Sequence, residues 1–97
     1  MPVEVRFHPA AERELRAAFV WYAERNFVAA VSFRAEAERA IVAIAESPTR
    51  WPKLTQSERR YIFPRFPFML VYRVQPNFVE VIAIAHQKRK PDYWTKR

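Results

Sequence analysis

Apolar and polar residues alternate at the start of the chain, where Val3, Val5 and Phe7 are separated by Glu4 and Arg6. A period of two places the apolar side chains on one face of an extended segment. We therefore expect a half-buried strand at this end of the chain.

Two stretches with helical spacing follow. The first begins at Pro9, which suits the first position of a helix, and His8 is available as its cap. The second begins at about Val28 and ends before Ser47 and Pro48, because the residue before a proline disfavours helical backbone. Their apolar stripes are Ala11, Leu15, Ala18, Phe19 and Tyr22 in the first, and Phe33, Ala37, Ala40, Ile41 and Ile44 in the second. We expect a helical hairpin whose apolar faces need another layer to cover them.

The chain contains no glycine, so its reversals need another residue that tolerates a positive φ. Asparagine is the next best candidate. The sequence has two, Asn26 between the helical stretches and Asn77 after Pro76. We expect both to lie at reversals, although Asn26 could equally cap the second helix.

Three more extended segments follow, at 59–63, 68–74 and 78–86. The last two form a predicted hairpin. Pro76 cannot take the positive φ of a tight primed turn, so we expect a four-residue loop over 75–78. This loop would pair Arg73 with Glu80 and Val74 with Val79.

The register divides the side chains of this hairpin between two faces. The helices should cover an apolar face made of Phe68, Leu70, Tyr72, Val74, Val79, Val81, Ala83 and Ala85. The opposite face would carry Met69, Val71, Arg73, Glu80, Ile82, Ile84 and His86. Neither helix remains to cover this second face. An open, partly apolar face rimmed by charges is typical of a docking surface for a partner.

The predicted fold class is α+β, in one domain over residues 1–97. We expect an N-terminal strand, an αα-hairpin and then a three-stranded antiparallel meander. The helices would pack on one face, and the first strand would complete a small antiparallel sheet.

Composition excludes several kinds of site. Without cysteine there is no disulfide, thiolate zinc site or cysteine nucleophile, and without glycine there is no phosphate-binding loop or dinucleotide fingerprint. We expect no cofactor and no metal, because His8 and His86 lie far apart and lack carboxylates at ligand spacing. No apolar run could span a membrane and no signal peptide precedes the first strand, so we expect a cytoplasmic protein without membrane contact.

The net charge of +7 lies in the second half of the chain. Residues 49–97 carry eleven lysines or arginines and three acidic residues. Such an imbalance indicates an anionic partner, either nucleic acid or an acidic protein segment. The excess positive charge is explained equally well if it only keeps the protein soluble.

Cations beside a histidine and a tyrosine supply the groups for metal-free RNA cleavage. This reaction needs a base for the 2′-hydroxyl, a cation for the phosphorane and an acid for the leaving oxygen. The candidates are the cations Arg59, Arg60, Arg65, Arg73, Lys88, Arg89 and Lys90, with His86, Tyr61 and Tyr93 nearby. A histidine at a strand end is more often structural than catalytic.

Simpler interpretations exist for the other candidates. Arg73 opposite Glu80 is explained by a cross-strand ion pair, which we favour over catalysis. We also favour a tail pinned to the core by Tyr93 and Trp94 over bases stacked on these rings. The basic run from Lys88 to Lys90 is equally well explained by solvation and by binding.

Motifs spread over nearly the whole chain resemble the RelE/ParE superfamily of toxins from bacterial type II toxin–antitoxin systems. The matching residues are Trp21-Tyr22, Pro48, Trp51-Pro52, Arg59-Arg60, Arg65-Phe66-Pro67-Phe68, Tyr72 and the block from His86 to Trp94. The resemblance implies a small toxin held inactive in a hetero-oligomer with its cognate antitoxin. It also implies one of two activities.

The RelE-like branch cleaves messenger RNA on the ribosome. By resemblance, Arg60 and Arg89 fall on its catalytic positions and Tyr93 near one, but Ile62 and Met69 replace further basic residues. The ParE-like branch lacks nuclease residues and inhibits DNA gyrase by protein contacts.

We favour a ParE-like toxin. The alternative is a ribosome-dependent endoribonuclease that uses Arg60, His86, Arg89 and Tyr93. A basic nucleic-acid-binding domain without toxicity is the third interpretation. The expected residues for binding the antitoxin or the target are Arg59, Arg65, Met69, Arg73, Ile82, Ile84, Lys88, Lys90 and Trp94.

Overall fold

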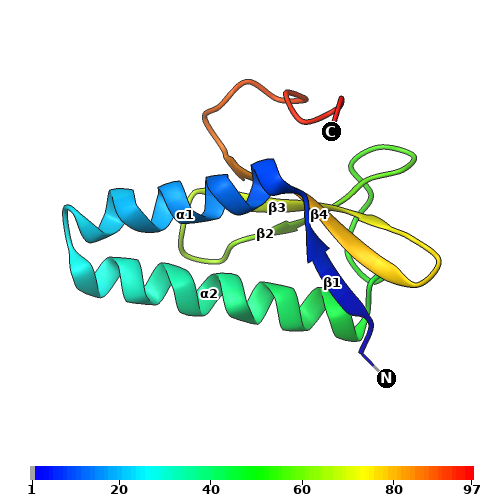
Figure 1. Ribbon diagram of the computed structural model, residues 1–97, viewed down its shortest axis with the longest axis horizontal. Coiled ribbons are helices and arrows are strands. Elements are labelled where there is room, and N and C mark those ends of the chain that lie inside the picture. The colour runs from blue at the N-terminus through cyan, green and yellow to red at the C-terminus, as the bar shows by residue number, and fades with distance from the viewer. Residues whose placement is uncertain (1) are drawn as a thin grey trace.

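Six elements follow one another in the computed structural model, which describes residues 2–97. They are β1 (Glu4–Phe7), α1 (Pro9–Ala23), α2 (Phe27–Glu46), β2 (Arg59–Ile62), β3 (Phe68–Val74) and β4 (Phe78–His86). The two helices lie side by side, and the C-terminal segment, orange to red in Figure 1, turns back after β4. The predicted α+β class and element order are confirmed.

The two helices begin at caps that the sequence supplies. His8 Nδ1 accepts a hydrogen bond from the backbone N–H of Ala10 at 3.0 Å, directly before Pro9 at the start of α1. Asn26 caps α2 by accepting from the N–H of Val28 at 3.0 Å. Its φ is −160°, so it starts a helix and does not reverse the chain through a positive φ.

Both asparagines lie at reversals, as expected, and the Asn26 cap is confirmed, but neither has the positive φ for which asparagine was considered. Among residues 2–97, Asp92 alone has one, at 70°. The β3–β4 turn is closed by a hydrogen bond of 2.8 Å from the N–H of Gln75 to the carbonyl of Phe78. A four-residue loop with Pro76 inside therefore makes this reversal without a left-handed residue.

The sheet has the strand order β1-β4-β3-β2 and is mixed. The meander of β2, β3 and β4 is antiparallel, as expected. The first strand, however, runs parallel to β4, with Val5 opposite Val79. The expectation of an antiparallel sheet throughout is wrong. Parallel pairing requires a long connection, and α1, α2, β2 and β3 all lie between β1 and β4 in the chain.

The β3–β4 register begins as predicted and then changes. Arg73 lies opposite Glu80 and Val74 opposite Val79. A bulge follows, because Tyr72 pairs with Val81 and Val71 pairs with Ala83. Ile82, which lies between Val81 and Ala83, is not paired with any residue of β3.

When a bulge inserts one residue into a strand, every side chain after the bulge points to the opposite face of the sheet. The predicted faces of β4 after the bulge are therefore wrong. Ile84 packs with the residues beneath the helices, and Ala83 and Ala85 pack on the other side. His86 also lies on the helix side, with its ring centroid 5.0 Å from that of Phe68.

A helix-side core fills the space between the hairpin and the sheet. Phe33 is fully buried at its centre, and its ring lies 5.2 Å from Phe68 and 5.7 Å from Phe63, centroid to centroid. Its buried members are Ala11, Ala18, Phe33, Ala37, Ala40, Ile44, Phe63, Phe68, Leu70, Tyr72, Val79, Val81 and Ile84.

A tail-side core covers the opposite face of the sheet. Its buried members are Val71, Ile82, Ala83, Ala85 and Trp94, with Leu54, Met69 and Tyr93 packed against them. The indole of Trp94 is 1% exposed, so the C-terminal segment takes the place of a third layer. The prediction that this face is open is wrong, whereas the interpretation of a tail pinned by Trp94 is confirmed.

Tyr72 makes the stability of this fold sensitive to high pH. Its hydroxyl donates to the carbonyl of Pro48 at 2.6 Å, and burial raises its pKa to about 12. Below pH 10 the tyrosine is neutral in both the folded and the unfolded chain, so its stabilising effect is complete. Between pH 10 and pH 12 only the unfolded chain ionises, so this stabilisation is lost as the pH rises.

We expect Tyr72→Phe to be less stable than the native protein by about 1 kcal/mol at pH 7, because one hydrogen bond is lost. The difference should disappear at about pH 11 and then reverse, since phenylalanine does not ionise. Urea unfolding of both proteins from pH 7 to pH 12 measures this. A constant difference over that range would contradict it.

Candidate functional site

The four candidate nuclease residues are divided between the two faces of the sheet. Arg60 lies opposite Val71 and therefore on the side of the tail-side core. His86 lies on the other side, against Phe68. A third strand, β3, separates the strands that carry them.

Arg89 and Tyr93 do lie together, at the start of the C-terminal segment. The guanidinium of Arg89 sits 3.7 Å above the centroid of the Tyr93 ring, and its backbone N–H donates to the carbonyl of His86 at 3.0 Å. Burial, followed by the nearby carboxylate of Glu14, raises the pKa of Tyr93 to about 12. Its hydroxyl is buried without a hydrogen-bond partner among the described residues. A buried hydroxyl is out of reach of an RNA substrate.

The predicted binding residues differ widely in exposure. Three of them are inside the fold. Ile82 and Ile84, both expected on an open face, are 0% and 3% exposed, and Trp94 is 1% exposed. Met69 is half-buried beside the tail-side core. The side chains at these positions pack against other parts of the same chain. The exposed members of the predicted set are Arg65, Lys88 and Lys90.

Two of the arginines hold neighbouring segments in place. Arg59 donates from Nη1 to the carbonyls of Thr49 and Trp51, at 3.0 and 2.7 Å, and so fixes the segment after α2. Arg73 bonds the carbonyl of Arg97 at 2.9 Å and the carboxylate of Glu58 at 3.3 Å. The predicted ion pair of Arg73 with Glu80 is also present, at a longer distance of 3.9 Å.

Buried carboxylates are the main features that the sequence patterns missed. Glu36 is 1% exposed, and its carboxylate accepts from the N–H and the Nε of Arg65 at 2.9 and 3.0 Å. Glu58 is 4% exposed and accepts from the indole N–H of Trp94 at 3.1 Å. Glu36 could have been found, because it lies inside the apolar stripe between Phe33 and Ala37.

Glu14 of α1 joins the helix to the sheet and to the end of the chain. One carboxylate oxygen accepts from the backbone N–H of Ile84 at 3.0 Å and from Arg97 at 2.9 Å. The other accepts from Arg97 at 3.0 Å and from Arg89 at 3.5 Å. The Arg97 guanidinium also donates to the carbonyl of Ile82 at 2.9 Å. Glu14 lies three residues after Ala11 and four before Ala18, so its place in the apolar stripe is the same signal that Glu36 gives.

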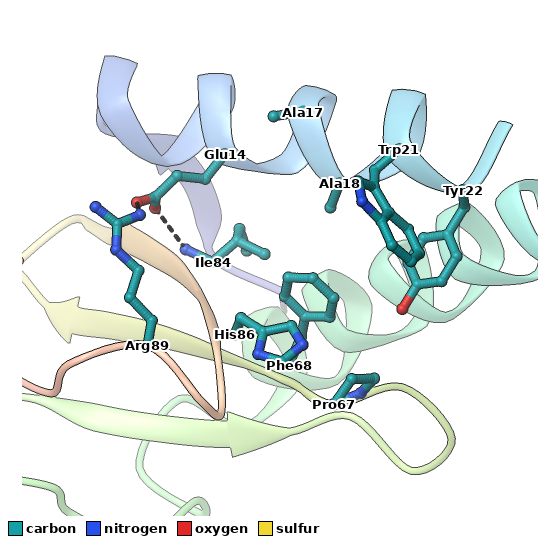
Figure 2. Close-up of a pocket in the computed structure, with 10 residues that line it drawn as sticks. All are labelled: Glu14, Ala17, Ala18, Trp21, Tyr22, Pro67, Phe68, Ile84, His86 and Arg89. Carbon is teal, nitrogen blue, oxygen red and sulfur yellow. Dashed lines mark hydrogen bonds and ion pairs between the residues drawn. The ribbon is translucent and has the colours of Figure 1, made fainter. Parts of the chain in front are cut away.

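A pocket of about 550 Å³ lies between α1 and the adjacent ends of β3 and β4 (Figure 2). We call it the α1 pocket. Its apolar residues are Ala17, Ala18, Trp21 and Tyr22 from the helix, and Pro67, Phe68 and Ile84 from the sheet side. Its polar residues are Glu14, His86 and Arg89. The pocket thus brings together two predicted site residues, His86 and Arg89, on the face opposite the one predicted.

The described residues contain neither a metal-binding cluster nor a membrane-spanning helix. Within residues 2–97, no three His, Cys, Asp or Glu side chains are grouped closely enough to hold a metal ion. None of the helices there has both the length and the apolar character required to cross a bilayer.

Comparison with known proteins identifies the family. The family described as ParE toxin of type II toxin-antitoxin system, parDE, matches residues 5–91. The structure is similar to a solved structure titled "Chromosomal ParDE TA system from P. aeruginosa", with a TM-score of 0.75 and 15% sequence identity over 87% of this chain and 95% of that chain. No match is found among curated proteins. At 15% identity the solved structure supports the fold, and the family match covers most of the sequence. The chain therefore belongs to the ParE toxin family of type II toxin–antitoxin systems.

Proposed function

We propose that this chain is the toxin of a toxin–antitoxin pair and that it acts in the cytoplasm by binding a cellular protein, DNA gyrase, without catalysis. A cognate antitoxin neutralises it in a hetero-oligomer. Membership of the ParE family supports the toxin role. The observation that carries the non-catalytic mechanism is the placement of Arg60 and His86 on opposite faces of the sheet.

The endoribonuclease alternative retains one supporting observation. Arg89 lies over Tyr93 and next to His86, which is a plausible arrangement of cation, acid and base. Proton transfer, however, requires the donor to come within hydrogen-bond reach of the leaving oxygen. The Tyr93 hydroxyl is buried inside the protein and cannot reach a leaving oxygen of bound RNA. We therefore rank the endoribonuclease below the binding toxin.

Tyr93→Phe separates the two functions. The change removes a buried hydroxyl that has no hydrogen-bond partner, so we expect the melting temperature to stay the same or rise slightly. A toxin that acts by binding should keep its full effect on growth. An enzyme that uses Tyr93 as its acid should lose activity by about 100-fold or more. Colony counts after induced expression of both proteins measure the difference.

The target is tested with the native protein. Induced expression should arrest growth, leave messenger RNA uncut at codon resolution and cause DNA damage, and the purified protein should inhibit supercoiling by DNA gyrase. Codon-positioned cuts in transcripts would instead support the ribosome-dependent nuclease. Normal growth would support the third interpretation, a basic nucleic-acid-binding domain without toxicity. Co-expression of the cognate antitoxin should restore growth, and we expect a reading frame adjacent to this gene to encode it.

A further inference from the structure

α2 carries a second apolar stripe, on the side that faces away from the core. Val28 is 74% exposed, Val31 50% and Val42 56%. With Ala35 they follow one another at intervals of three, four and seven residues, which places all four on one side of the helix. Figure 1 shows α2 along the lower edge of the molecule, with α1 above it. We call these four residues the α2 ridge.

The spacing of the α2 ridge is typical of a helix that packs against a second helix. Intervals of three and four residues form the heptad pattern, in which the apolar side of one helix interlocks with that of another. The opposite side of α2 is already used, because Phe33 and Ala37 are buried in the helix-side core. A shallow pocket of about 530 Å³ lies over the second half of the ridge, where Ala35 and Val42 are among its lining residues. The small side chain of Ala35 leaves room there for a bulkier one from a partner.

Charges beside the α2 ridge favour a second copy of this chain as that partner. The exposed charged residues of α2 are Arg34, Glu38, Arg39 and Glu46, two of each sign. The exposed side of the helix therefore presents no net charge, although the whole chain carries +7. Two copies repel each other through this excess of positive charge, and least where they meet at a neutral face. An acidic partner, in contrast, would gain no electrostatic attraction here.

An antiparallel arrangement brings opposite charges of the two copies together. A two-fold axis at the level of residue 36 makes Arg34 of one copy level with Glu38 of the other, because both are two residues from that level. Symmetry then forms the same pair a second time. Val31 is level with residue 41 of the other copy, which is one residue, or about 1.5 Å, from Val42. Within residues 2–97 neither Arg34 nor Glu38 has an ion pair, so both can pair between copies.

We propose that two copies of this chain associate through the α2 ridge, as an antiparallel pair of helices with a two-fold axis near residue 36. This inference goes beyond the proposed function and does not depend on it. α2 has 20 residues and is therefore about 30 Å long. A contact made by one pair of helices is small, below about 1,200 Å² in total, and contacts of this size are typical of weak complexes. We therefore expect a reversible dimer with a dissociation constant of about 10–100 µM.

Sedimentation of the purified full chain over a range of concentrations measures the association. Val31→Glu should weaken it by at least about tenfold, because it places a carboxylate against Val42 of the other copy. The matched control is Ile62→Glu, the same kind of change at a side chain that is 51% exposed. Ile62 lies opposite Met69 and so on the face of the sheet away from α2. This control should dimerise within about twofold of the native affinity.

Charge reversals test the register. Arg34→Glu places a carboxylate beside Glu38 of the other copy, and Glu38→Arg places a cation beside Arg34. Each single change should weaken the dimer by about fivefold or more, because like charges then meet twice. The double variant restores both pairs with their signs exchanged and should dimerise within about twofold of the native affinity. Both positions are exposed, so all variants should melt within a few degrees of the native chain.

Three results would overturn the inference. The first is a native chain that sediments as a monomer at every concentration. The second is a dimer that a folded Val31→Glu variant leaves intact, since its contact would then lie elsewhere. The third is equal affinity of the single and double charge variants; if Val31→Glu does not fold, this comparison decides. None of these measurements involves growth, gyrase or an antitoxin, so failure here leaves the proposed function intact.

Discussion

Replacing Trp94 with alanine should lower the free energy of unfolding by about 3–5 kcal/mol, the range measured for large aromatic residues in protein cores. The indole is 1% exposed and is the largest side chain of the tail-side core. Its loss would leave a cavity over Val71 and Ile82. It would also remove the indole N–H that donates to the buried carboxylate of Glu58 at 3.1 Å.

Thermal and urea unfolding measure this effect. For a domain of this length, such a loss lowers the melting temperature by more than about 12 °C. Thr95→Ala is the matched control, because Thr95 is exposed and adjacent, and it should melt near the native temperature. A small effect of Trp94→Ala would show that the C-terminal segment does not cover the sheet in solution. The sheet face first expected to be open would then again be a candidate docking surface.

Replacing Glu14 with alanine should also be strongly destabilising, by about 3 kcal/mol, because it leaves a partly buried guanidinium without its partner. The Arg97 side chain is 17% exposed and depends on Glu14 for two hydrogen bonds, of 2.9 and 3.0 Å. The backbone N–H of Ile84 would lose its acceptor as well. We expect the C-terminal segment to separate from α1.

Glu12→Ala is the control on the same helix. The Glu12 carboxylate is 65% exposed and lies 3.9 Å from Arg16, and exposed pairs of this kind contribute about 0–1 kcal/mol. Urea unfolding should therefore separate the two variants clearly. Hydrogen exchange at the backbone N–H of Ile84 should become faster in Glu14→Ala and remain slow in Glu12→Ala. Equal stability of the two variants would contradict the network around Glu14.

These two residues explain why the candidate binding site moved from one face of the sheet to the other. Trp94 closes the face that the strand pattern left open, and Glu14 ties the end of the chain to the helix. The α1 pocket then remains as the apolar cavity that includes the predicted site residues His86 and Arg89.

Local patterns were sufficient for the elements and for part of the register. Helical spacing and the caps His8 and Asn26 determined where the helices begin, because capping depends on residues close in sequence. The turn around Pro76 placed Arg73 opposite Glu80 for the same reason. The family resemblance, carried by motifs over most of the chain, is confirmed by the match over residues 5–91.

Tertiary structure decided the faces of the sheet and the burial of charge. The bulge at Ile82 exchanges the sides of β4, and no local pattern in a run of apolar residues signals such an insertion. Glu14 and Glu58 bind Arg97 and Trp94, which are 83 and 36 residues away along the chain, so no local pattern reveals these pairings. The sequence by itself determined the elements, their order and the family. Only the packing of distant segments decided which side of the sheet remains accessible, because burial depends on the whole chain.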